Sequence, residues 1–356
     1  MSARRPRCGA LLPVLLSVLL AASAAAQTFT VQRIAIGGEG GSDYLAADTA
    51  TGRVYVSRGT HVMVVDGASG KVVGDIAGTP RVHGIAFARG VHRGFTTNAG
   101  DSTSTMFDLG TMAVVGKVHV GIDGLDGIMY DAASDRILTI NHSHVGGKAA
   151  GTATVIDAKT GEVVKTVNLS GAAPEGGASD GKGRIFINIE DGNAIDVVDT
   201  KTWTLTTTWK IDPCDGPTGI AYDKASNRIF SGCSGKSVAV DAATGKVVAE
   251  LANGDGVDAL GWDASQKMIY IPAGQSGNVT VYHQDSADKY TLVATVPTMR
   301  GAKTIAVDES THRAYVFTPE YGPAPTPAPG ATPPAGGRGR GPRGPIVGAW
   351  FITILH

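Results

Sequence analysis

The sequence predicts an all-β fold, a seven-bladed β-propeller, on the basis of three observations. A motif of two short apolar runs around a polar turn comes round seven times, at intervals of about 40–50 residues, which is the period of propeller blades. Glycine is abundant, with 49 in 356 residues, and this suits many short strands joined by tight turns. The two ends of the chain carry strands that together complete one repeat. The seven central segments are Asp43–Ser57, His83–Thr97, Asp126–Ile140, Glu175–Asn188, Thr218–Gly232, Asp258–Pro272 and Lys303–Phe317.

Each repeat predicts four antiparallel strands. In the fifth repeat the first strand is the run Gly219–Asp223 and the second is Arg228–Gly232. The third strand ends in an apolar pair and an aspartate, as at Val240 and Asp241, and the fourth is the valine-rich run that follows Gly245. Alternating apolar positions with Gly, Asp, Asn or Ser at the breaks are typical of strands and hairpins. A four-stranded unit of this length is a propeller blade.

The last repeat lacks a fourth strand. It has runs at Thr304–Asp308, Arg313–Thr318 and Ile346–Leu355 and then the chain stops. The run Phe29–Ile36 resembles the fourth strands of the other repeats. We therefore expect it to pair with the last blade and close the ring, which removes exposed sheet edges.

Two segments differ from the repeats. Residues 1–26 have three arginines, a 12-residue apolar run and a small-residue site before Gln27, the pattern of a signal peptide cut between Ala26 and Gln27. Residues 320–345 are rich in Pro, Gly and Ala, a composition that predicts a disordered loop. Residues 27–356 would form a single propeller domain.

Charge and compartment exclude some functions. The net charge is −1, and removing the signal peptide with its three arginines makes it −4, which disfavours nucleic acid as a partner. No further segment is apolar enough to cross a membrane after signal removal, so we expect a periplasmic or secreted monomer. In an oxidising compartment Cys214 and Cys233 favour a disulfide, the alternative being a redox or metal-binding thiol pair.

Seven residues start the first strands at equivalent positions, five before the aspartate that ends the strand in the first repeat. Since the first strand of a blade is innermost, these residues should ring one mouth of the central channel. Most are charged, and close carboxylates repel each other unless a cation lies between them. We call them the rim residues: Asp43, His83, Asp126, Glu175, Thr218, Asp258 and Lys303.

The rim has two interpretations that the sequence leaves open. It is either a solvated, ligand-selecting mouth or the site of a divalent metal, a cofactor that nothing in the sequence makes certain. The metal candidates are Asp43, His83, Asp126, Glu175 and Asp258. The ends of the second strands and the loops after them reach the same mouth, and His142 with His144 would bring imidazoles close to Asp126. The further candidates for ligand binding are Arg58, Asn98, Asn141, His142 and Glu190.

The second strands also carry a family resemblance. The segments VYVS, GFTTN, ILTIN and IYIPA resemble the YVTN element of the YVTN-repeat β-propellers, and the chain from about Thr28 to Leu355 is similar to YncE-like exported propellers. The resemblance implies a seven-bladed ring, and it supplies no catalytic residues.

The function predicted is therefore a binding or interaction scaffold with its ligand site at the channel mouth. Its partner would be a small molecule, a peptide or an envelope protein. The alternative is a metal-dependent, lactonase-like hydrolase that uses the Asp/Glu/His ring to activate water. The chain lacks the haem, nucleophile-elbow, phosphate-loop and zinc-protease motifs, so a non-enzymatic role is favoured.

Overall fold

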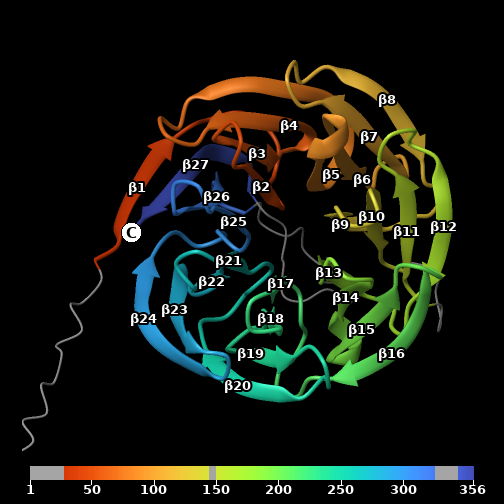
Figure 1. Ribbon diagram of the computed structural model, residues 1–356. Coiled ribbons are helices and arrows are strands. Elements are labelled where there is room, and N and C mark those ends of the chain that lie inside the picture. The colour runs from red at the N-terminus through yellow and green to blue at the C-terminus, as the bar shows by residue number, and fades with distance from the viewer. Residues whose placement is uncertain (1–27, 144–149, 325–343) are drawn as a thin grey trace, which may run out of the picture.

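The computed structural model describes residues 28–143, 150–324 and 344–356. Within these ranges the chain is a β-propeller, whose sheets surround a central axis (Figure 1). The predicted signal peptide with its cleavage site, His144 and the central part of the predicted Pro/Gly loop lie outside the described residues. In the described part no helix has the length and hydropathy needed to span a membrane.

Five sheets have four antiparallel strands each. The first contains β9 (Leu125–Asp131), β10 (Arg136–Asn141), β11 (Thr152–Asp157) and β12 (Val163–Asn168). The second contains β13 (Pro174–Ser179), β14 (Arg184–Ile189), β15 (Ala194–Asp199) and β16 (Thr204–Lys210), with the 3-10 turn η2 (Glu190–Gly192). The third contains β17 (Ile220–Asp223), β18 (Arg228–Ser231), β19 (Lys236–Asp241) and β20 (Val247–Ala252). The fourth contains β21 (Gly261–Asp263), β22 (Met268–Ala273), β23 (Asn278–Ser286) and β24 (Lys289–Pro297).

The fifth four-stranded sheet joins the two ends of the chain. It contains β25 (Ile305–Asp308), β26 (Arg313–Tyr321), β27 (Ile346–Leu355) and β1 (Thr30–Ala35). Strand β1 pairs antiparallel with β27 along its whole length, and Figure 1 shows the first and last strands side by side. The prediction that the N-terminal strand completes the last blade is confirmed.

One boundary in this sheet was predicted wrongly. The Pro/Gly loop was expected to begin at Glu320, but β26 continues to Tyr321, because Glu320 and Tyr321 pair with the start of β27. The Trp350 indole also donates a hydrogen bond of 2.9 Å to the Glu320 carboxylate. These contacts extend the hairpin beyond the apolar run visible in the sequence.

The sixth sheet has seven strands because one long strand pairs with a strand on each side and so joins two sets of strands. It contains β2 (Leu45–Asp48), β3 (Arg53–Ser57), β4 (Gly59–Asp66), β5 (Val72–Ala88), β6 (Arg93–Asn98), β7 (Thr103–Asp108) and β8 (Val114–His119), with the turn η1 (Arg89–Val91). The 17-residue β5 pairs with β4 between Val72 and Ala77 and again at Val82, and with β6 at Val82 and from Ile85 to Ala88. The structure thus shows five separate blades and this larger sheet, and the count of seven blades stays a prediction.

The recurring aspartates of the repeat hold its turns. Asp223 ends the first strand of its blade, is buried, and accepts a hydrogen bond of 2.9 Å from the backbone of Ala225. Asp241 ends a third strand, and the backbone of Thr244 donates to it at 2.9 Å. An aspartate that captures the backbone two or three residues on stabilises a tight turn. These repeated aspartates therefore have a structural role.

The core lies between neighbouring blades. The second and third strands are covered on both faces, which is why they read as nearly continuous apolar runs in the sequence. All six residues of β22 are buried, whereas the outer strand β12 exposes all but one of its six. The innermost strands contact one another in the closed order β2, β5, β9, β13, β17, β21, β25 and back to β2.

Cys214 and Cys233 form a disulfide, as predicted. Cys214 precedes β17 and Cys233 follows β18, and their Cα atoms are 5.6 Å apart. Both residues are fully buried. The bond links the segment before β17 to the segment after β18, at the same end of the blade as the rim residue Thr218.

Deleting β1 should destabilise the whole ring. A chain that starts at Gly37 loses the strand that covers β27, so we expect a lower melting temperature, a broader transition and aggregation through the exposed edge. The measurement is thermal unfolding by circular dichroism, with a chain that starts at Thr28 as the control. Equal melting curves for the two chains would show that the ring does not depend on this closure.

Removing the disulfide should cost stability by loop entropy. For the double variant Cys214→Ala/Cys233→Ala we expect a loss of about 3 kcal/mol in the free energy of unfolding, since the bond closes a loop of roughly 20 residues. Urea unfolding with and without reductant measures this. The wild type should respond to reductant and the double variant should not; a reductant-insensitive wild type contradicts the prediction.

Candidate functional site

All seven rim residues line one cavity of about 1190 Å³. Asp126, His83 and Glu175 lie within the inner strands β9, β5 and β13, and the other four lie two or three residues before theirs. Because the inner strands converge on one axis, residues up to 260 positions apart in the sequence meet at this mouth.

Small residues after the rim positions let the inner strands approach each other closely. A side chain at Gly127 would bring its Cβ within 2.6 Å of the Glu175 carbonyl oxygen, and one at Gly176 within 2.7 Å of the Thr218 carbonyl. Such contacts do not occur, so the neighbouring backbone occupies the space that a side chain would need. The first repeat differs, because Tyr44 follows its rim residue Asp43.

Hydrogen bonds between neighbouring blades fix the rim backbone. The Thr97 hydroxyl donates to the Asp126 carbonyl at 2.5 Å, and the Thr304 hydroxyl donates to the Asp43 carbonyl at 2.5 Å. The Asn188 amide donates to the Thr218 carbonyl at 3.1 Å. These bonds hold the rim side chains at defined positions, as a preorganised site requires.

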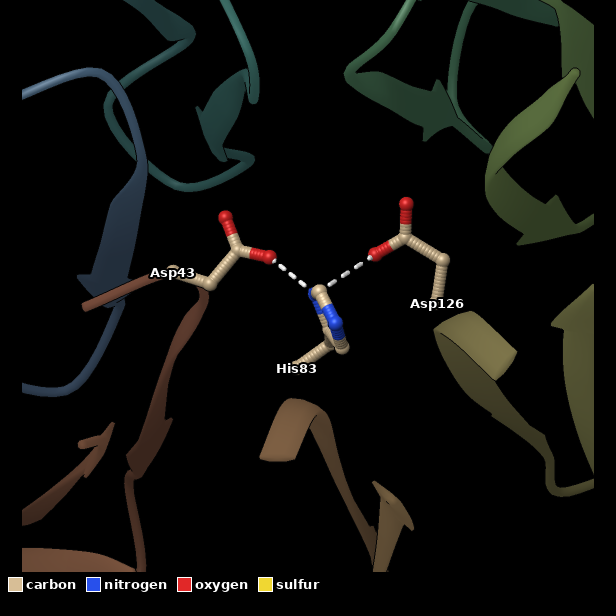
Figure 2. A group of neighbouring side chains, drawn as sticks. All are labelled: Asp43, His83 and Asp126. Carbon is tan, nitrogen blue, oxygen red and sulfur yellow. Dashed lines mark hydrogen bonds and ion pairs between the residues drawn. The ribbon is translucent and has the colours of Figure 1, made fainter. Parts of the chain in front are cut away.

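His83 lies between two carboxylates (Figure 2). Its Nδ1 is 2.5 Å from Asp43 Oδ2 and 3.3 Å from Asp126 Oδ1. Burial by itself lowers the pKa of His83, but the carboxylates of Asp126 and Asp43 outweigh it and raise the pKa to about 10. Burial raises the pKa of Asp43, yet the hydrogen bond with His83 and the Lys303 ammonium hold it well below its usual range.

His142 makes an equivalent bridge on the other side of Asp126. Its Nε2 is 3.3 Å from Asp126 Oδ2 and 3.2 Å from Glu175 Oε1. Burial lowers the pKa of His142, but the hydrogen bond and charge of Glu175 raise it to about 9. The pKa of Glu175 is raised by burial and further by the Asp126 charge, which together exceed the opposing effect of His142.

Lys303 closes the other half of the rim. Its Nζ donates to Asp43 Oδ1 at 2.8 Å and also forms an ion pair with Asp258. Burial lowers the pKa of Lys303, but the charges of Asp258 and Asp43 raise it above its usual value. The pKa of Asp258 is raised, mainly by burial and against the effect of Lys303. Asp258 thus already has a cation.

The groups that could hold a metal differ in part from the predicted set. Among the described residues two groups bring ligand atoms within 4.8 Å of one another, Asp43 with His83 and Asp126, and Asp126 with His142 and Glu175. His142, predicted only as a ligand-binding residue, belongs to the second group. Asp258 belongs to neither, because its carboxylate faces Lys303.

Three predicted binding residues are buried scaffold residues and do not line the cavity. The Arg58 guanidinium donates to backbone carbonyls of the glycine-rich segment before β2 and packs over the Phe317 ring, 4.8 Å from its centre. The side-chain amides of Asn98 and Asn141 each donate to two threonines of the neighbouring third strand. These asparagines end the second strand in their repeats and join it to the third. Glu190, in contrast, lines the cavity.

Several lining residues were not among those predicted from the sequence. The most informative is Tyr44, whose hydroxyl donates to Glu175 Oε2 at 3.2 Å from the first repeat to the fourth. A signal was present, since the residue after the rim position is Gly, Ala or Thr in the other repeats. Arg81 within β5, Tyr321 at the end of β26 and Arg300 in the loop before β25 also line the cavity, and no repeat pattern marks them.

Comparisons with known proteins identify the fold and nothing finer. No protein-family model matches the chain, and no curated protein sequence matches it. Among solved structures, a chain of hydrazine synthase from Kuenenia stuttgartiensis is 18% identical with a TM-score of 0.68, and the match covers 79% of this chain and 93% of that one. A chain of the mitotic checkpoint complex is 16% identical with a TM-score of 0.68, covering 86% and 96%.

Replacing His83 should remove a pH-dependent part of the stability. The folded-state pKa of His83 is raised from 6.5 to about 10, so its contribution is complete below pH 6.5 and is lost as the pH rises through about 10. At pH 6 we expect the free energy of unfolding of the chelator-treated wild type to exceed that of His83→Gln by on the order of a few kcal/mol. This difference should shrink steadily as the pH rises to 9.5.

Urea unfolding at a series of pH values measures this difference. The control is the same substitution in an Asp43→Asn background, where one of the two carboxylates that face His83 is neutral and the pH-dependent part should be smaller. A difference that stays constant from pH 6 to 9.5 in the wild-type background would contradict the assignment.

Proposed function

We propose that the protein is a binding propeller whose ligand site is the cavity at the channel mouth. One observation carries the proposal: the rim position, whose residue differs in charge from repeat to repeat, lines this cavity in every repeat. The repeated residues hold turns and strands, so recognition would come from the residues that differ. Concave sites with a few convergent polar groups are the usual ligand sites of proteins.

We also propose that the ring has seven blades and is of the YncE-like, YVTN-repeat kind. Counting β5 as the fourth strand of one blade and the first of the next divides the seven-stranded sheet into two blades that share it. The closed order of inner strands supports this division, since β5 lies between β2 and β9. Two of the four second strands that carry the YVTN-like element end in the structural residues Asn98 and Asn141.

Export to an oxidising compartment belongs to the same proposal. The buried Cys214–Cys233 disulfide supports it, because such bonds persist outside the reducing cytosol. The arginines and apolar run of residues 1–26 have the composition of a signal peptide. The site would then be reached by molecules of the periplasm or the medium.

The cavity is suited to a polar ligand that carries both acceptors and donors. Lys303 and Arg300 offer cationic groups, Asp258 and Glu190 offer carboxylates, and Tyr44 adds an aromatic ring. Its volume of about 1190 Å³ is larger than a typical small-molecule pocket of roughly 300–1,000 Å³. A small polar molecule, a peptide or a loop of an envelope protein would fit, and a similar propeller occurs in the mitotic checkpoint complex.

A metal-dependent hydrolase is the second candidate. It is favoured by the two carboxylate–imidazole groups at Asp126, since a bound metal there would supply an activated water. Hydrolysis of a panel of lactones with and without chelator distinguishes it from a scaffold. Turnover that disappears with chelator supports the hydrolase. No turnover of any lactone supports the scaffold.

A ligand bound at the mouth should depend on Arg300. We expect native mass spectrometry of the protein purified from its own envelope to show a bound species, and Arg300→Ala to lose it because a cationic lining group is removed. Lys236→Ala is the matched control, because Lys236 pairs with Glu250 on the third and fourth strands and does not line the cavity.

Retention by both variants would contradict the site, and absence of any bound species from the wild type would contradict the binding role.

A further inference from the structure

The two oxygens of the Asp126 carboxylate face different histidines. Oδ1 lies 3.3 Å from His83 Nδ1, and Oδ2 lies 3.3 Å from His142 Nε2. Each histidine in turn faces one further carboxylate, Asp43 or Glu175. Asp126 is therefore the shared member of two groups with the same composition, one imidazole and two carboxylates each.

The spacings match the edges of a metal coordination shell. Ligand atoms about 2.0–2.2 Å from one zinc ion lie roughly 3.0–3.5 Å from each other. Three of the four imidazole–carboxylate distances are 3.2–3.3 Å. Only the contact between His83 and Asp43, at 2.5 Å, is shorter, and it would open as an ion replaced the shared proton.

Asp43 and Glu175 are each bound by a further residue through the carboxylate oxygen that does not face a histidine. Lys303 Nζ binds Asp43 Oδ1 at 2.8 Å, which leaves Oδ2 directed at His83. The Tyr44 hydroxyl binds Glu175 Oε2 at 3.2 Å, which leaves Oε1 directed at His142. Groups that hold the non-ligating oxygen of a carboxylate are typical of metal sites. Lys303 and Tyr44 would be positioning residues.

A buried acceptor points the same way. Asp126 Oδ1 is inaccessible to solvent and accepts no hydrogen bond, although its residue lies in a cavity lined by polar groups. The nearest donor, His83 Nδ1, has its short contact with Asp43 instead. At 3.3 Å the protonated His83 ring offsets the charge of this oxygen without donating a hydrogen bond to it, and a metal ion would bind the oxygen directly. Glu175, on the other group, is almost fully buried as well.

We propose that the channel mouth binds two divalent transition-metal ions bridged by the Asp126 carboxylate, one with Asp43 and His83 and the other with His142 and Glu175. The inference deepens the site proposed above and rests on it. Imidazole ligands with carboxylates suit Zn²⁺, Co²⁺, Ni²⁺ or Mn²⁺ better than Ca²⁺ or Mg²⁺, which prefer oxygen ligands alone. The remaining positions of each ion would face the cavity, open to water or to an oxygen or nitrogen ligand.

Zinc titration of chelator-treated protein tests the proposal with the metal ion alone as the probe. We expect two equivalents of Zn²⁺ per chain by isothermal titration calorimetry, with two bound zinc ions in the native mass spectrum. Asp43→Asn and Glu175→Gln should each retain one equivalent, because each removes a ligand of one ion only. Asp126→Asn should weaken both equivalents at least roughly tenfold.

Asp285→Asn is the matched control, since its carboxylate also faces an imidazole, that of His283, but does not line the cavity, and it should retain both equivalents. Thermal unfolding of each metal-free variant checks that it folds, and if Asp126→Asn does not, the two single-ion variants still decide.

If the wild type bound only one equivalent of Zn²⁺, and both Asp43→Asn and Glu175→Gln lost it, the bridged pair of ions would be overturned. If the wild type bound no Zn²⁺, the metal site itself would be overturned. The binding function fails separately, through the loss of a co-purifying ligand, and zinc binding can be measured whether or not such a ligand exists.

Discussion

Convergence of the inner strands on a single axis forces charged side chains from the whole length of the chain into one mouth. Like charges brought together in a partly buried space raise each other's energy unless opposite charges separate them. The order of the rim meets this constraint. His83 comes between Asp43 and Asp126, and Lys303 comes between Asp258 and Asp43, because repeats that are adjacent in the sequence are adjacent around the closed ring.

The scaffold makes this order reliable. Closure by β1 places the last repeat beside the first, so that Lys303 can reach Asp43 across 260 positions of sequence. The glycines that follow rim residues allow neighbouring backbones to touch, and hydroxyls such as Thr97 bind the carbonyls of the next blade. Loss of closure would therefore disturb the charged site as well as the sheet edge.

The repeat explains how much of the structure could be predicted. Aligning its copies predicted the propeller and the cavity position of every rim residue, because strand periodicity and turn aspartates are local signals, and the expected oxidising compartment predicted the disulfide. The roles of Arg58 and Asn98 were missed, since a polar residue at a strand end reads the same whether it binds a ligand or the backbone. The contact of Tyr44 with Glu175 crosses the mouth between distant repeats, and only the three-dimensional ring reveals it.

Because the repeats differ at the rim position, the charged groups are distributed asymmetrically around the channel mouth, as they would not be in identical repeats. One side carries the imidazoles around Asp126, and the opposite side carries the ion pair of Lys303 and Asp258. The uncharged Thr218 separates Glu175 from Asp258, and its hydroxyl donates to the backbone carbonyls of Gly232 and Val257. A ligand at the mouth would thus meet an imidazole–carboxylate side, a lysine–carboxylate side and a neutral gap. Three unlike sectors around one axis are sufficient to orient an asymmetric molecule, and a single ring of equivalent carboxylates is not.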